Sequence, residues 1–117
     1  MKGDRFAGFT VQSDLVRAGK TSRSLYDVQF FFGEQTFFNS KLKPVKNVIH
    51  CEIQMQGSDV VFSGWAAQSL SEENFSIQQG LSIAFRNAQR KLNYSCFHNQ
   101  VGDAFRVWIK EVRFDVR

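Results

Sequence analysis

The sequence contains a single proline, only two cysteines and no long apolar run. Pro44 lies within the lysine-rich residues 39–46, which predicts a basic connection there, because proline is disfavoured inside regular elements. Cys51 and Cys96 show no disulfide-framework spacing, and the residues after Met1 lack the apolar core of a signal peptide. Without a run of about 20 apolar residues, the sequence predicts no membrane-spanning helix. These absences favour a soluble protein in a reducing cytoplasm.

Sequence signatures of catalysis are also missing. There is no glycine-rich phosphate loop, no nucleophile elbow and no paired-carboxylate motif. His50 and Cys51, with Cys96 and His98, supply the ligand types of a zinc site or of a Cys/His nucleophile pair. However, His50 and Cys51 are neighbours in a predicted strand, so we expect a buried Cys51 and a surface His50 on opposite faces. We therefore expect no enzyme, no metal and no cofactor.

Phenylalanine and positive charge are abundant in the chain. Its 117 residues include 13 Phe, which supply ample apolar surface for one packed core. Two cores would each fall near the size at which burial no longer offsets chain entropy, so we expect a single domain, residues 1–117. A domain of this size need not bury every ring, and exposed rings would mark a homodimer or partner interface. The formal charge of +4 and the pI of about 9.3 favour phosphate-bearing partners or acidic proteins.

The apolar and aromatic segments predict strands along most of the chain, although residues 5–16 fit neither a strand nor a helix period throughout. Alternation of apolar and polar residues supports some of these strands. It is clearest at residues 48–56, where apolar residues occupy every second position. Residues 57–59 are expected to turn the chain into a partner strand, in which Gly64 allows a bulge or a close approach by another group. Charged residues and turn formers at residues 17–24 indicate an exposed loop. The predicted strands are residues 5–16, 25–32, 36–38, 48–56, 60–66 and 105–116.

One helix is predicted between the hairpin and the last strand. Ser69 precedes Glu72 at capping-box spacing, and Glu73 adds a second acid where a helix N-terminus favours it. Asn93 is expected to end the helix. The apolar stripe between these ends consists of Ile77, Leu81, Ala84, Phe85, Ala88 and Leu92. We therefore expect an α+β fold, with an antiparallel sheet of about five to six strands and one main helix packed on one face.

The last predicted strand carries the main candidate binding site. Period-2 geometry places Arg106, Trp108 and Lys110 on one face, opposite an apolar face. Such a face would pair phosphate with charge and stack a base on the indole. The alternative is that Trp108 packs in a second small core, with Arg106 and Lys110 as solvated rim charges.

The predicted helix offers a second set of cations. Arg86 and Arg90 lie four residues apart, near Gln79 and Ser82, on the side away from the apolar stripe. This donor-rich face is suited to phosphate, and the alternative is an ordinary solvated helix face. The cations at residues 17–23 and 39–46 are expected to serve solubility. The alternative for residues 17–23 is a mobile loop, allowed by Gly19 and Gly33, that closes over a ligand.

The predicted helix also resembles a known group of proteins. Phe75, Gly80, Ile83-Ala84, Asn87-Ala88 and Leu92 follow a spacing similar to that of small phage-encoded proteins, among them the Thoeris anti-defence sponges. These proteins sequester cyclic ADP-ribose-type signalling nucleotides without degrading them. The resemblance therefore implies a phage-type accessory protein that binds a nucleotide. The sequence departs from the pattern at Asn87, where the pattern has arginine, although Arg86 is adjacent.

Together these observations predict a non-enzymatic protein that binds a nucleotide or another phosphate-bearing anionic ligand. Arg106 and Lys110 would bind phosphate, Trp108 would stack a base, and the helix cations Arg86 and Arg90 would contribute if the helix end lies beside the last strand. The alternatives are a protein–protein inhibitor of a host factor, which presents its phenylalanines as an apolar patch, and a small DNA- or RNA-binding module. We expect a homodimer or higher homo-oligomer, no membrane partner, and the host cytoplasm if the protein is phage-encoded.

Overall fold

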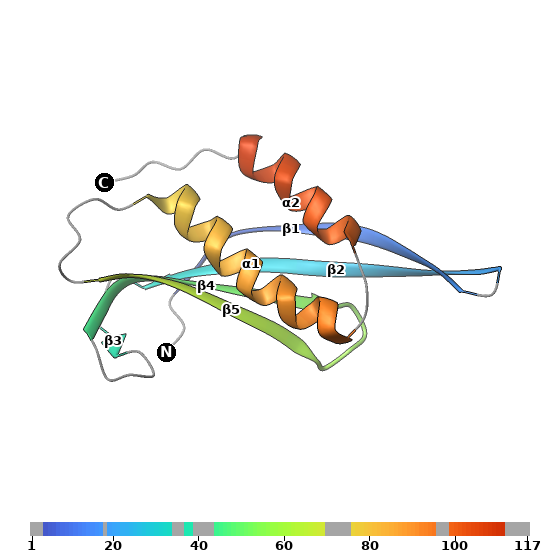
Figure 1. Ribbon diagram of the computed structural model, residues 1–117, viewed down its shortest axis with the longest axis horizontal. Coiled ribbons are helices and arrows are strands. Elements are labelled where there is room, and N and C mark those ends of the chain that lie inside the picture. Colours follow the sequence, from blue (N-terminus) through green and yellow to red (C-terminus); the bar gives the residue numbers. More distant parts are fainter. Residues whose placement is uncertain are drawn as a thin grey trace.

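The computed structural model describes residues 4–17, 19–33, 37–38, 44–69, 76–95 and 99–111. The fold is α+β, with one antiparallel sheet and two helices that both cover the same face of the sheet (Figure 1). In the described ranges, no helix combines the length and the apolar character that crossing a bilayer requires. The elements are β1 (Asp4–Arg17), β2 (Lys20–Gly33), β3 (Phe37–Phe38), β4 (Pro44–Met55), β5 (Val61–Ser69), α1 (Ile77–Ser95) and α2 (Asn99–Glu111).

The four long strands form an antiparallel meander in the order β1-β2-β4-β5. The two-residue strand β3 pairs with the beginning of β4, so the sheet has four long strands and one short strand in the described residues, whereas about five to six strands, with a last one at residues 105–116, were predicted. The pairing of β4 with β5 shifts between Lys46 and Ile49. Asn47 lies in this bulge with a φ of 51°, and its amide donates to Gln68 Oε1 at 2.6 Å.

The predicted strands at residues 25–32, 48–56 and 60–66 are confirmed as β2, β4 and β5, and the alternation predicted for residues 48–56 is confirmed as well. Val28, Phe30, Ile49 and Cys51 are fully buried on the face that the helices cover, as period-2 geometry requires. The prediction of an exposed loop at residues 17–24 is wrong, because β1 and β2 continue to Arg17 and Lys20 and turn at Gly19, which has a φ of 76°. These strand residues are charged and polar because they lie beyond the core, and such a composition is also typical of an exposed loop.

The predicted helix is confirmed as α1, but its start differs from the prediction. Ser69 belongs to β5 and does not cap a helix, while Glu72 and Glu73 lie outside the described residues. Ser76 takes the capping role instead, because its hydroxyl accepts a hydrogen bond from the Gln79 N–H at 3.2 Å. The helix also continues past the predicted stop, to Ser95. Its predicted apolar stripe packs on β4 and β5.

The prediction of a last strand at residues 105–116 is wrong over residues 105–111, which belong to the second helix, α2, and residues 112–116 lie outside the described residues. Val101 and Phe105 are buried and Trp108 is half-buried, at i, i+4 and i+7, which is a helical stripe. Within residues 105–109 the apolar residues also occupy every second position, so the sequence period alone did not distinguish a helix from a strand. Val107 shows the difference, because it is 58% exposed and does not share a face with Phe105. The fold therefore has two helices where one main helix was predicted.

Candidate functional site

The structure separates the three residues that were predicted to form one binding face. Arg106 and Lys110 are exposed on α2, whereas Trp108 turns toward the sheet. The Trp108 ring stacks on Phe30, with centroids 5.3 Å apart and planes 1° apart, and it also lies 5.1 Å from the ring of Phe9. The prediction of a common face is wrong because α2 is a helix, in which residues two apart point to opposite sides. Trp108 therefore packs against the main core and not in the second small core of the alternative interpretation.

The cations of α1 and α2 come together in the helical layer. Arg86 and Arg90 are exposed on α1, followed by Lys91, and no acidic residue occurs between Ile77 and Ser95. On α2, Arg106 pairs with Asp103 at 2.7 Å, but both side chains are largely exposed, so this ion pair contributes little stability. The outer surface of α1 is therefore more positive than that of α2.

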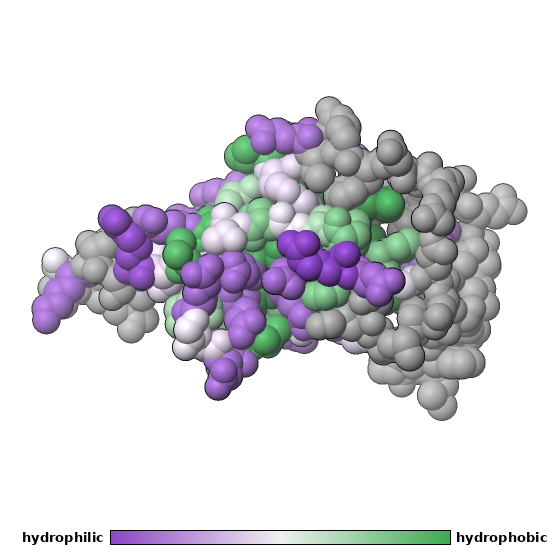
Figure 2. Space-filling view, turned by 180° about the vertical axis from the view of Figure 1, so that it is seen from behind, coloured by the Kyte–Doolittle hydropathy of each residue, from purple (hydrophilic) through white to green (hydrophobic). Residues whose placement is uncertain are grey.

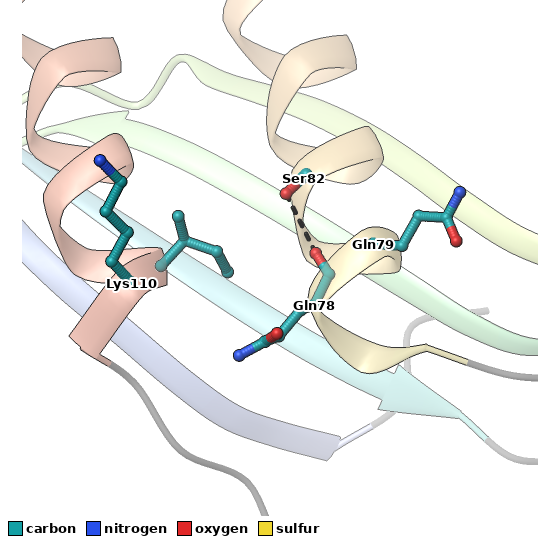
Figure 3. Close-up of a pocket in the computed structure, with 5 residues that line it drawn as sticks. Gln78, Gln79, Ser82 and Lys110 are labelled. Carbon is teal, nitrogen blue, oxygen red and sulfur yellow. Dashed lines mark hydrogen bonds between the residues drawn. The ribbon is translucent and has the colours of Figure 1, made fainter.

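An open groove of about 680 Å³ lies between the beginning of α1 and the end of α2 (Figure 3). Gln78 and Ser82 line it from α1, and Ile109 and Lys110 line it from α2, while Gln79 lies at its border and points away in the view of Figure 3. The Ser82 hydroxyl donates a hydrogen bond to Gln78 O at 3.0 Å.

The lining of this groove is polar and carries a positive charge. Its described residues offer two amides, a hydroxyl, an ammonium group and one apolar side chain, and none of them is a carboxylate. Arg86 follows Ser82 by one helical turn, and Arg106 precedes Lys110 by one turn, so both continue the rim of the groove. The first turn of α1 adds the positive end of its helix dipole. The groove is therefore suited to an anionic ligand.

Only part of this site could be predicted by sequence analysis. It identified Lys110, Arg86 and Arg106, and it placed Gln79 and Ser82 near the cations of the first helix. It missed Gln78 and Ile109, because only the packing of a second helix brings these residues to one groove. The helical stripe from Val101 to Ile109 was the signal that could have found them.

The opposite face of the sheet mixes hydrophilic and hydrophobic residues where its residues are described (Figure 2), and Trp65 is 45% exposed there. The Asp27 carboxylate accepts hydrogen bonds there from Thr10 Oγ1 at 2.8 Å and from Gln56 Nε2 at 3.2 Å. The predicted patch of exposed phenylalanines is wrong for Phe30 and Phe31, which are buried, and the side chains of residues 37–38 lie outside the described part. An apolar docking surface made of these rings therefore has no support.

Cys51 and His50 lie on opposite faces of β4, as predicted. Cys51 is fully buried under the helices, and burial, with a smaller effect of the Glu52 charge, raises the pKa of its thiol well above the usual range. His50 is not the surface residue that was predicted, since both of its ring nitrogens are buried and its ring stacks on Trp65 at 4.7 Å. Among the described residues, no cluster of His, Cys, Asp and Glu could hold a metal ion. Cys96 and His98 lie outside them.

Cys51 is expected to resist thiol reagents in the folded protein. In a Cys96→Ser variant, a disulfide reagent at mildly alkaline pH should modify Cys51 at least about 100-fold more slowly than it modifies the unfolded chain, because the buried thiol does not ionise. The absorbance of the released thiolate measures the rate, and the same variant in guanidinium chloride is the control. Equal rates in the two states would contradict the burial of Cys51.

No protein-family model, curated protein or solved structure matches this chain.

Proposed function

We propose that this chain is a non-enzymatic binding protein that takes up a phosphate-bearing ligand of the nucleotide type in the groove between α1 and α2. The observation that carries the proposal is the groove itself, in which Gln78 and Ser82 face Lys110 across the gap between two helices. No described lining residue is an imidazole, a thiol or a carboxylate, and the groove offers hydrogen bonds and charge from two amides, a hydroxyl and an ammonium group.

Each lining residue has a distinct role in this proposal. The Lys110 ammonium pairs with a phosphate oxygen, and the Gln78 amide donates a hydrogen bond beside it. Ser82 already donates to Gln78 O, so its oxygen is left to accept a hydrogen bond from a sugar hydroxyl. Ile109 supplies apolar contact for a sugar or base edge. A ligand with a phosphate at one end and a less polar group at the other matches this arrangement.

The rim cations supply long-range attraction in this proposal. Arg86 and Arg106 lie one turn away from the groove on their own helices, where they reach a second phosphate or raise the local concentration of an anion. Trp108 has no part in ligand stacking here, because its ring packs on Phe30. Arg90 lies further from the groove than Arg86, because it is two helical turns beyond Ser82, which lines the groove.

The resemblance to the Thoeris anti-defence sponges adds a limited argument. Three positions of the shared pattern, Gly80, Ala84 and Ala88, are buried in α1. Small residues at these positions allow the helix to lie close to the sheet, so the pattern describes helix packing more than ligand contacts. The proposal therefore includes a phage anti-defence role only because the proposed ligand is of the nucleotide type that the sponges bind.

Replacing Lys110 by glutamine is expected to weaken ligand binding about tenfold, since a charged hydrogen bond to phosphate contributes roughly 1.5–3 kcal/mol. Calorimetric titration with ADP-ribose and with cyclic dinucleotides measures the change. Lys91→Gln is the matched control, because it removes the same charge from the far flank of the helical layer and is expected to change affinity less than about twofold. Equal losses in both variants, or no heat from any ligand with the natural chain, would contradict the proposal.

A further inference from the structure

The outer part of the β1–β2 hairpin extends beyond the rest of the fold. Within the described residues, β2 pairs with β4 only from Tyr26 onward, and Leu25 O accepts one further hydrogen bond from the Gln56 N–H at 2.8 Å. On β1, the Ser13 hydroxyl donates to Gln100 Oε1 of α2 at 2.9 Å. Past these two anchors the strands pair only with each other, and Figure 1 shows them reaching beyond the ends of both helices.

We call this two-stranded segment, residues 14–17 and 19–23, the arm. Its pairs are Asp14↔Arg23, Leu15↔Ser22, Val16↔Thr21 and Arg17↔Lys20. A ribbon of two strands without a third strand or a helix is only marginally stable in water. The arm therefore gains most from a partner that contacts both of its faces or both of its strands.

The charges of the arm point to an anionic partner. It carries three cations, Arg17, Lys20 and Arg23, against one carboxylate, Asp14. Arg17 and Lys20 form the last described pair before the turn, and like charges directly opposite each other destabilise a strand pair. Lys20 and Arg23 are exposed. An anion at the tip would neutralise part of the positive charge of the arm.

The dimensions of the arm fit the groove of a nucleic-acid duplex. From Ser13 to Arg17 the strand rises about 13 Å, at roughly 3.3 Å per residue. The major groove of B-DNA is about 8.5 Å deep and about 12 Å wide, and it admits a two-stranded β-ribbon. We propose that the arm binds double-stranded nucleic acid by inserting its basic tip into a groove, so that positions 17 and 20, which pair at the tip, lie against the phosphates of the two walls.

Other partners fit the arm less well. A second copy of the chain would bring an arm of the same net positive charge, so two arms would repel each other. A single strand has no groove, and it is usually held by aromatic rings on which bases stack, which the sequence of the arm lacks. The proposal is independent of the α1–α2 groove, because the two sites share no residue.

The test measures binding of a labelled DNA duplex of about two helical turns by fluorescence anisotropy over a range of salt concentrations. In the full chain, the combined variant Arg17→Gln, Lys20→Gln and Arg23→Gln is expected to weaken binding at least about tenfold and to reduce the salt slope by about 2, because each of the two phosphate contacts at the tip contributes about 0.9. The control variant removes three charges from α1 instead, through Arg86→Gln, Arg90→Gln and Lys91→Gln. The control variant should weaken binding less than about threefold. Because each variant loses three positive charges, the two are compared at equal net charge.

Several results would overturn the proposal. They are equal losses for the arm and control variants, duplex binding by the arm variant at natural strength, or equal affinity for the duplex and a single strand of the same length. If circular dichroism shows that the combined variant is unfolded, Lys20→Gln alone is the substitute, with an expected slope reduction of about 0.9. Lys110→Gln should leave duplex binding unchanged, so failure of the groove proposal and failure of the arm proposal give different results.

Discussion

Replacing Phe105 by alanine is expected to lower the free energy of unfolding by about 3–5 kcal/mol, which is the usual loss for a buried aromatic ring. Phe105 is only 6% exposed, and its ring stacks on Phe85 with centroids 4.1 Å apart and planes 3° apart. It also lies 6.2 Å from the ring of Phe30, so it joins α1, α2 and the sheet. No other residue of α2 stacks directly on a ring of α1 in the described structure.

Val107→Ala is the matched control for this prediction. Val107 is 58% exposed on the same helix, so its truncation is expected to change stability by less than about 0.5 kcal/mol. Urea denaturation followed by circular dichroism measures both variants. A strand at these residues would place Phe105 and Val107 on one buried face, and two large losses would therefore contradict the helical assignment of α2.

Replacing Gly64 by valine is expected to destabilise the fold by about 3 kcal/mol, because overpacking forces backbone to move. Gly64 lies on β5 directly under α1, and a Cβ at this position would overlap Ala84 O and Ala88 N and would lie 2.8 Å from Asn87 C. All three of these atoms belong to helix backbone, which cannot turn aside as a side chain would. The missing side chain therefore sets how closely α1 approaches the sheet.

Ala67→Val serves as the control for Gly64→Val. Ala67 is exposed on the same strand but faces away from α1, so the added methyl groups meet no backbone and stability should change by less than about 0.5 kcal/mol. The midpoints of urea denaturation compare the two variants. If Gly64→Val unfolds at the same urea concentration as the natural chain, the close contact of α1 with β5 is refuted.

The strands and α1 could be predicted because their sequence periods are long. In β4 the alternation is maintained from Ile49 to Met55, and in α1 the apolar stripe runs from Ile77 to Leu92 over more than four turns. Over such a length, the alternation fits a strand and not a helix, and the apolar stripe fits a helix and not a strand. Gly64 was also identified as a position of close approach, although the approaching group became known only from the structure.

The second helix could not be predicted from alternation over residues 105–109 alone. Five residues span less than two helical turns, so a helical stripe and a strand face share several positions. The residue that decides between them, Val101, lies before this short window and continues the helical period. Because the strand assignment was wrong, the face of Arg106, Trp108 and Lys110 derived from it was wrong as well.

The candidate groove and the arm depend on contacts between segments distant in sequence. Gln78 and Lys110 are brought to one groove only because α2 folds back beside α1. The cations of residues 17–23 were interpreted as a loop, because hairpin strands without a core have no apolar alternation to reveal them. Both sites became visible once the register of β1 with β2 and the placement of the helices were known.

Mapping the ligand site by nuclear magnetic resonance tests the central claim most directly. Titration of the isotope-labelled chain with ADP-ribose is predicted to shift the backbone amide signals of Gln78, Gln79, Ser82 and Lys110 more than any others, because these residues line the groove. The arm residues 19–23 should remain unshifted. No shift at millimolar ligand, or the largest shifts on the strands away from α1 and α2, would contradict the assignment of the groove as the binding site.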